Sequence, residues 1–360
     1  MTADDLAQAL RRAVLAQRFE TTADSLQGGA PLGVHPSLDL AVVVFPRGAP
    51  PVAANVLFSR EHPAGLVARF DPVTGAVANI AFRADVRNAA GDSYAWLPGA
   101  DWSRIDFPAW FGTGPRFVAP YPASLLKMMV AVGVARLVDD GRSDWALPLA
   151  HGGETRAVGD WLHDMIIVSS NEATSALVAH LHDRGAIRRE AGREVRNELH
   201  ELFAAHGLPG LRIANTQPDG GWGNGSGAGV GQIQMTAWDA LRLMWRLDAD
   251  APPQPPLVST ASRAVIRRAL DAQQLNEVLS SESLRELPGW VPGIPARFAH
   301  KTGNTQNYTS DAGIVHDGDL HYLIALTTSL GSRYAPADAA TTWRIPALGG
   351  AIHAWLKAAA

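Results

Sequence analysis

The sequence of 360 residues contains no cysteine. This absence excludes disulfide bridges, thiolate metal sites and a cysteine nucleophile, although it leaves the cellular compartment open. The sequence also lacks any run of about eighteen apolar residues, so it predicts no membrane-spanning helix. Charged residues make up 18% of the chain and the formal net charge is −4. No basic block stands out, so we expect no nucleic-acid partner.

The first residues have the pattern of an amphipathic helix, not of an export signal. Between Met1 and Phe19, the acidic Asp4 and Asp5 come first and apolar residues such as Leu6 and Leu10 recur at helical spacing. The continuous apolar core and the small-residue cleavage site of a secretory leader are absent. We therefore expect a cytoplasmic protein, or a periplasmic or secreted one if a leader has been removed.

Strand patterns occur near both ends of the chain, with helical patterns between them. Apolar runs at Leu38 to Phe45, Val52 to Phe58 and Leu320 to Thr328 predict strands, and Asp317-Gly318 between apolar runs predicts a hairpin. The middle of the chain is predicted to be helical, including a charged helix from about Ile187 to His206. Hairpins connect the predicted strands, which favours one antiparallel sheet.

These patterns predict an α+β fold in which N- and C-terminal helices flank an antiparallel sheet and a large all-helical lobe is inserted. Residues 1–118 and 285–360 would form the sheet lobe. Residues 119–284 would form the helical lobe.

A serine and a lysine lie three residues apart at the start of an apolar helix. Ser124 and Lys127 share one face of that helix, with about 5–6 Å between their Cβ atoms. A serine hydroxyl needs a neighbouring base, and a lysine can serve only if burial or positive charge lowers its pKa. The apolar residues around Lys127 would lower its pKa through burial. The pair predicts a serine nucleophile with a lysine base, although a capping serine beside an ordinary lysine gives the same tetrapeptide.

Two further motifs follow in fitting contexts. Ser169-Ser170-Asn171 interrupts two helices, and Lys301-Thr302-Gly303 ends a strand. Together with Ser124-Leu125-Leu126-Lys127, they give the chain a resemblance to the penicillin-recognising serine hydrolases, which comprise class A β-lactamases, DD-peptidases and their relatives. The resemblance covers about Ala109 to Leu330 and implies a β-lactamase/transpeptidase-like fold.

The resemblance also implies a role for each motif residue. Ser124 would be the nucleophile, Lys127 its base, and Ser169 with Lys301 the route by which a proton reaches the leaving group. The expected substrate is a small molecule or a peptide with a carboxylate. Substrate binding would involve Asn171, Thr302, Gly303 and Asn304, with Tyr308 a further candidate for ligand contact.

One expected group is missing. Class A β-lactamases use a glutamate between the second and third motifs to activate water, and this sequence has no glutamate between Glu201 and Glu277. The corresponding stretch, 215–231, offers only Asp219 as a carboxylate. The resemblance therefore implies an acyl-enzyme on an amide, β-lactam, peptide or ester, with weak or no class A turnover. A β-lactam or peptidoglycan-fragment sensor and a transacylase of secondary metabolism are the alternatives.

The remaining patterns predict neither a cofactor nor a metal. The glycine-rich stretch 215–231 has no G-x-G-x-x-G and no strand before it, so it is better interpreted as a loop over the site. Trp222 and Trp238 are candidates for either an apolar pocket or the core. The histidines considered as ligands are isolated or lie on opposite faces of their elements: His151, His163, His180, His182, His206 and His300.

Overall fold

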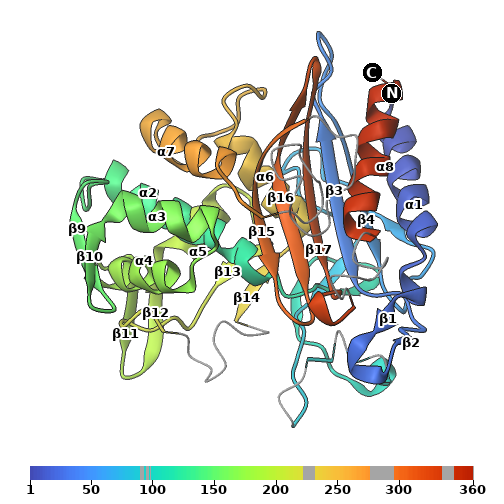
Figure 1. Ribbon diagram of the computed structural model, residues 1–360, viewed down its shortest axis with the longest axis horizontal. Helices are drawn as coiled ribbons and strands as arrows, with labels where there is room; N and C mark the ends of the chain where they lie inside the picture. The colour runs from blue at the N-terminus through green and yellow to red at the C-terminus, as the bar shows by residue number, and fades with distance from the viewer. Residues whose placement is uncertain are drawn as a thin grey trace.

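The computed structural model of the chain describes residues 1–89, 93–94, 97, 99–221, 232–275, 296–334 and 344–359. Its centre is a six-stranded antiparallel sheet with the strand order β15-β16-β17-β3-β4-β5 (Figure 1). Strand β17 pairs with β3, so the beginning and the end of the chain form one sheet, as predicted. The strands are β3 (Leu38–Val44), β4 (Val52–Phe58), β5 (Leu66–Val67), β15 (Arg297–Asn304), β16 (Thr309–Asp317) and β17 (Leu320–Thr328).

Helices cover both faces of this sheet. Helices α1 (Ala3–Gln17) and α8 (Arg344–Ala359) lie side by side on one face, with the two chain ends close together (Figure 1). Along β17, Ile324 packs toward this helix pair, whereas Leu323 packs into the core on the other face. Because both faces are buried, the central strands appear in the sequence as continuous apolar runs.

The inserted segment is largely helical and packs against the second face. Its helices are η4 (Ala123–Leu126), α2 (Lys127–Asp139), α3 (Val158–Ile167), α4 (Asn171–Asp183), α5 (Glu198–Ala205), α6 (Ala237–Leu247) and α7 (Thr260–Asp271). Of these, α6, α7 and η4 contact the sheet directly. The α+β fold class is confirmed, while the lobe boundaries at residues 118 and 284 stay a prediction.

The insert is not all-helical, because three small two-stranded sheets lie within it. They pair β9 (Pro148–His151) with β10 (Glu154–Ala157), β11 (Ile187–Glu190) with β12 (Arg193–Asn197), and β13 (Leu211–Ile213) with β14 (Ile233–Met235). The short remaining elements lie before the insert: η1 (Phe19–Thr21), β1 (Ala23–Asp24), η2 (Ser25–Gln27), β2 (Ala30–Pro31), β6 (Ala81–Arg83), η3 (Trp102–Arg104), β7 (Ala109–Phe111) and β8 (Arg116–Val118). After β17 comes the single turn η6 (Ser332–Tyr334).

The predicted helix from Ile187 to His206 is wrong in its first half. Strands β11 and β12 form a hairpin there, and only the last eight residues before His206 are helical. Ala191 and Gly192 form the turn with φ of 47° and 75°. Glycine adopts this left-handed conformation without strain, which favours a tight turn over a continuous helix.

Throughout the described ranges, no helix is both long and apolar enough to cross a bilayer.

Candidate active site

Ser124 lies in η4, a single turn of 3-10 helix that continues directly into α2. The preceding residue, Ala123, has φ of 49°, a left-handed conformation that is strained for a residue with a Cβ. Ala123, Leu125 and Leu126 are buried, whereas Ser124 is half-buried. The buried neighbours fix the turn and leave the serine at the start of a helix, where the helix dipole favours developing negative charge.

Lys127, the first residue of α2, is buried with 1% of its surface exposed. Its Nζ donates to the Ser169 carbonyl at 2.6 Å and lies 2.9 Å from Asn171 Oδ1 and 3.1 Å from Ser169 Oγ. These partners are all neutral. Burial lowers the pKa of Lys127 from 10.5 to about 7, because the ammonium loses its hydration and these partners supply no opposite charge. Near neutral pH this amine can therefore accept a proton.

Ser169 reaches Lys127 because the chain bends sharply between α3 and α4. Its φ of 57° is again left-handed for a residue with a side chain. The neighbouring Ser170 has a different task, since its hydroxyl accepts a hydrogen bond from Ala173 N–H and caps α4. Asn171 then begins the helix. The two serines of the motif thus differ in their contacts: Ser170 caps α4, whereas Ser169 faces Lys127 and Lys301.

Lys301 on β15 completes the cluster. Its Nζ donates to Ser169 Oγ at 3.0 Å and to the Thr302 carbonyl at 2.7 Å. Ser169 Oγ therefore lies within hydrogen-bond distance of two lysines that come from different layers of the fold. The whole chain has only three lysines, and two of them meet here. A hydroxyl between two amines can pass a proton from one side to the other.

Gly303 brings the edge strand β15 against η4, the turn that carries Ser124 (called below the nucleophile turn, after the predicted role of Ser124). A Cβ at this position would lie 2.7 Å from the backbone nitrogens of both Ser124 and Leu125, and would also clash with Ser310 Oγ. Only glycine permits this approach. Ser310, on the neighbouring strand β16, donates to the Pro122 carbonyl and holds the turn to the sheet. Sequence reasoning missed Ser310, because this contact joins residues 188 positions apart.

Thr302 and Asn304, two other predicted binding residues, differ in their exposure to solvent. Thr302 alternates with Lys301 along β15 and is buried, with 2% of its surface exposed. Asn304 is exposed at the end of β15, and its side chain donates to Thr309 Oγ1 at 3.3 Å. Their contacts with a substrate stay predictions.

Tyr308 is buried, with 4% of its surface exposed. Its hydroxyl donates to Asp85 Oδ2 at 2.9 Å and lies against Ser93 Oγ. Its ring meets the ring of Tyr121, three residues before Ser124, edge-on with centroids 5.7 Å apart. In this arrangement Tyr308 supports the approach to Ser124, and its predicted contact with a ligand stays a prediction.

The carboxylate of Asp219 is engaged in its own turn. Asp219 is exposed, and its Oδ1 accepts a hydrogen bond from Gly221 N–H at 2.8 Å. The next residue, Gly220, presses against the Ser175 carbonyl on α4 so closely that a Cβ would clash. Of the other predicted residues, Trp238 is buried and stacks on Phe70 at 4.0 Å, whereas Trp222 lies outside the described residues.

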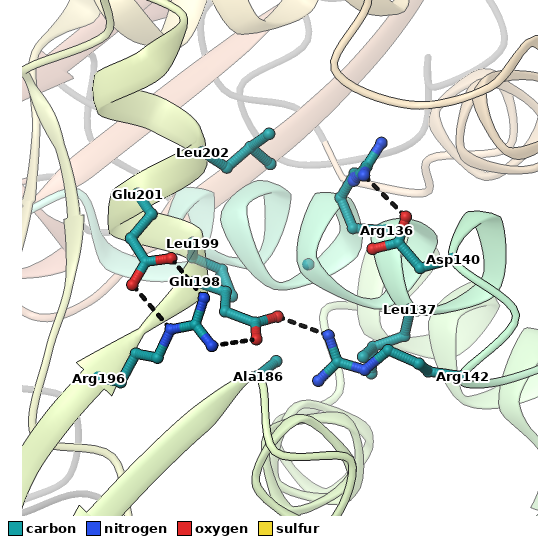
Figure 2. A pocket seen from close by; sticks show the side chains of 11 residues that line it. Arg136, Leu137, Asp140, Arg142, Ala186, Arg196, Glu198, Leu199, Glu201 and Leu202 are labelled. Carbon is teal, nitrogen blue, oxygen red and sulfur yellow. Dashed lines mark hydrogen bonds and ion pairs between the residues drawn. The ribbon is translucent and has the colours of Figure 1, made fainter.

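A cavity of about 430 Å³ lies elsewhere in the insert, between α2, α5 and the β11–β12 hairpin (Figure 2). Its floor is apolar and its rim consists of ion pairs. Arg142 binds Glu198 at 2.6 Å, Arg196 binds Glu201 at 2.9 Å, and Arg136 binds the carboxylate at the end of its own helix at 2.8 Å. Every charge drawn in Figure 2 is paired with an opposite one. This cavity contains none of the predicted catalytic residues.

Residues 119–347 match the model of the Beta-lactamase enzyme family. The chain belongs to that family. The match contains all three motifs and covers more than half of the sequence.

Solved structures of PBP-A and of β-lactamases share the fold across nearly the whole chain. A PBP-A variant, solved as its acyl-enzyme complex with penicillin G, is 16% identical, with a TM-score of 0.53 over 99% of this chain and 98% of its own. TLA-3 extended-spectrum β-lactamase is 11% identical, with a TM-score of 0.54 over 97% and 99%. The β-lactamase from Sphaerobacter thermophilus is 14% identical, with a TM-score of 0.50 over 98% and 97%. A comparison with curated proteins finds no match.

Proposed function

We propose that the protein is a serine hydrolase or acyltransferase that forms an acyl-enzyme at Ser124, with Lys127 as the general base. The burial of Lys127 among neutral partners carries this proposal. A lysine with a pKa of about 7 has a large neutral fraction at physiological pH, which an exposed lysine lacks. When such an amine lies three residues from a serine at the start of a helix, it can activate the serine hydroxyl as a nucleophile.

The acylation step follows from these positions. The Lys127 amine takes the proton of Ser124 Oγ while Oγ bonds to the substrate carbonyl carbon. The backbone N–H groups of Ser124 and Asn304 would stabilise the resulting oxyanion. When the tetrahedral intermediate collapses, the bond to the leaving nitrogen or oxygen breaks. That atom receives a proton from the Ser169 hydroxyl, which regains one from the Lys127 ammonium.

The substrate is an amide, β-lactam, peptide or ester with a carboxylate. Lys301 supplies positive charge beside the nucleophile turn, and Thr302 follows it on the same edge strand. Strand β15 is the outermost strand of the sheet, so a substrate with an extended backbone can lie along its outer edge. Gly303 keeps that edge close to Ser124.

The fate of the acyl-enzyme is a separate part of the proposal. Residues 202–276 contain no glutamate, and Asp219 is held by its own turn. We propose weak or absent class A β-lactamase turnover. The same observation favours two alternatives, a sensor that stays acylated and a transacylase that delivers the acyl group to an amine or alcohol.

Intact-protein mass spectrometry tests the nucleophile. The protein is mixed separately with benzylpenicillin and with p-nitrophenyl acetate, and Ser124→Ala serves as the control. We expect an adduct of one whole penicillin, or of one acetyl group, on the wild-type chain alone. If the folded wild-type protein forms no adduct with either donor, or if Ser124→Ala still forms it, the assignment of Ser124 is wrong.

The lifetime of the adduct separates the alternatives. A penicillin adduct that persists for hours indicates a sensor, and rapid return to free protein indicates hydrolysis by another group. Faster loss of the acetyl group when an amine or alcohol is added, together with formation of the acylated acceptor, indicates a transacylase.

A further inference from the structure

Two histidines and a buried aspartate meet at the end of the sheet opposite the nucleophile. His316 on β16 and His321 on β17 are directly paired across the hairpin, so their side chains share one face of the sheet. Their rings stack with centroids 4.1 Å apart. Asp248, immediately after α6, reaches them with a side chain that is entirely buried, and its Oδ2 lies 2.7 Å from His321 Nε2.

The three groups are close enough to share one ion. One potential ligand atom from each of Asp248, His316 and His321 lies within 4.8 Å of the other two. Around a tetrahedral Zn²⁺ with bonds of about 2.0–2.1 Å, ligand atoms are separated by roughly 3.3 Å. The two stacked rings would have to tilt apart for a nitrogen of each to face one ion. His316 also lies 3.7 Å from Asp250 Oδ2, and that carboxylate is two-thirds exposed toward solvent.

One nitrogen of this cluster has no hydrogen-bond partner. His316 Nε2 is buried and makes no hydrogen bond within the described ranges. A buried nitrogen without a hydrogen-bond partner is costly, and a bound water molecule or ion would satisfy it. The side chain of His316 is 23% exposed, which leaves a route of entry from solvent.

The surroundings orient the aspartate. Asp248 Oδ1 accepts hydrogen bonds from Arg267 Nη1 and from Asp250 N–H, both at 3.2 Å. These contacts occupy Oδ1 and leave Oδ2 directed at His321. Carboxylate ligands of metals are held by outer hydrogen bonds of this kind. The ring of Phe45 packs on His321 with centroids 4.6 Å apart and forms an apolar wall.

We propose that Asp248, His316 and His321 bind a divalent transition-metal ion of the zinc class, with Asp250 as the fourth ligand. The two imidazole nitrogens favour Zn²⁺, which binds nitrogen and oxygen ligands, over Mg²⁺, which prefers oxygen ligands alone. On binding, the proton between His321 and Asp248 passes to solvent. The histidines considered from the sequence lie elsewhere, and this proposal departs from the expectation of no metal.

The proposed ion is structural. His316 is six residues along β16 from Ser310, which contacts the nucleophile turn, so about 20 Å separates the two regions. The ion would join the end of α6 to the β16–β17 hairpin and so hold the insert against the sheet. Acylation of Ser124 should therefore proceed without it, and the two proposals can fail independently.

Metal binding by the full-length protein tests the site. The protein, free of any polyhistidine tag, is stripped with a chelator and titrated with Zn²⁺, Co²⁺ or Mg²⁺ in separate calorimetry experiments. Calorimetry should show one Zn²⁺ bound per chain and no binding of Mg²⁺. The absorption spectrum of the Co²⁺-loaded protein should show the visible band typical of tetrahedral Co²⁺. At a hundredfold excess over the dissociation constant, Zn²⁺ should raise the melting temperature by about 3–6 °C.

Two variants locate the ion. His316→Gln and His321→Gln should each weaken Zn²⁺ binding at least about tenfold. Gln at 321 can still donate to Asp248, so this variant should fold. The control His163→Gln removes an exposed histidine that lies 3.3 Å from Asp164, and it should bind Zn²⁺ like the wild type. No Zn²⁺ binding by the wild type, or equal binding by all variants, would overturn the proposal.

Discussion

At its N-terminal end, helix α2 buries the Lys127 amine, which has no carboxylate partner in the described part of the chain, whereas the arginines at its C-terminal end and around the cavity beside it are paired with carboxylates. Arg136, Arg142 and Arg196 there each bind at least one carboxylate (Figure 2). The same helix thus has a buried lysine without an opposite charge at one end and an arginine paired with a carboxylate at the other.

The difference separates a reactive region from a stabilising one. A buried amine without an opposite charge costs stability, and this cost lowers its pKa into the range useful for catalysis. A partly exposed ion pair contributes little stability and perturbs no chemistry. A concave region full of charged residues is therefore a weaker sign of function than a single buried lysine.

The largest expected effect comes from removing the buried amine. Lys127→Met retains an unbranched side chain but has no base, so acylation of Ser124 should slow by about 10²–10⁴-fold. The rate is measured as adduct formation with benzylpenicillin by mass spectrometry, with circular dichroism as the check on folding. A folded Lys127→Met protein that acylates within tenfold of the wild type would show that another group is the base.

A substitution at the edge strand should be nearly as severe. In Gly303→Ala, the new Cβ would lie 2.7 Å from Ser124 N, so the nucleophile turn or the strand must move. We expect acylation to slow by about 10²-fold, as shifts of about 1 Å commonly do. The control is Gly99→Ala, where no atom lies within 4 Å of the new Cβ. Equal rates for both variants would refute the close approach.

The pH dependence of acylation should follow Lys127. Below its pKa of about 7 the amine is protonated and cannot accept the Ser124 proton. The acylation rate should therefore rise about tenfold per pH unit on the acidic side and level off above pH 7–8. Stopped-flow measurement with a chromogenic ester at pH 5–9 checks this. A flat profile would contradict the base assignment.

Stability should depend on pH in the corresponding direction. The pKa of Lys127 is lower in the folded state than in the unfolded state, so between about 7 and 10.5 the unfolded chain binds more protons. The destabilisation caused by Lys127 is fully present below pH 7 and is lost as the pH rises toward 10.5. In urea denaturation, Lys127→Met should be more stable than the wild type at pH 6, by roughly 1–3 kcal/mol, and lose this advantage by pH 10.

The smallest effect is expected at the paired end. Glu198→Gln removes the carboxylate that binds Arg142 at 2.6 Å and Arg196 at 3.3 Å. These side chains are about a quarter to two-fifths exposed, so the loss should be about 1 kcal/mol or less in urea denaturation. Acylation of Ser124 should not change. A large fall in the acylation rate would show that the two ends of α2 are coupled.

The sequence was most informative where neighbouring residues act together. The strand from Leu38 and the β16–β17 hairpin could be predicted because local propensity and burial favour the same structure. The charged segment from Ile187 could not, because exposed arginines and glutamates mask the alternation of a hairpin.

In the candidate site, the sequence motifs pointed to the residues that the structure brings together, but the backbone conformation around them could not be predicted. Residue type gives no indication that Ala123 and Ser169 adopt left-handed conformations, since these depend on the surrounding fold. Contacts such as Ser310 with Pro122 and Tyr308 with Asp85 also join distant parts of the chain. Spacing along the sequence carries no signal for them.

The pairing of β3 with β17 has a consequence for synthesis of the protein on the ribosome. Strands β3 and β4 emerge early, yet β3 meets its partner β17 only after nearly the whole chain has been made. Ser124 and Lys127 emerge well before Lys301, so the nascent chain contains the proposed nucleophile long before the strand that completes the proposed site. Such distant pairings fold slowly and leave apolar strand edges exposed in the meantime. A growing chain of this protein therefore keeps the edge of β3 unpaired until β17 has been made, and Lys301 joins Lys127 and Ser169 only once β15 is in place.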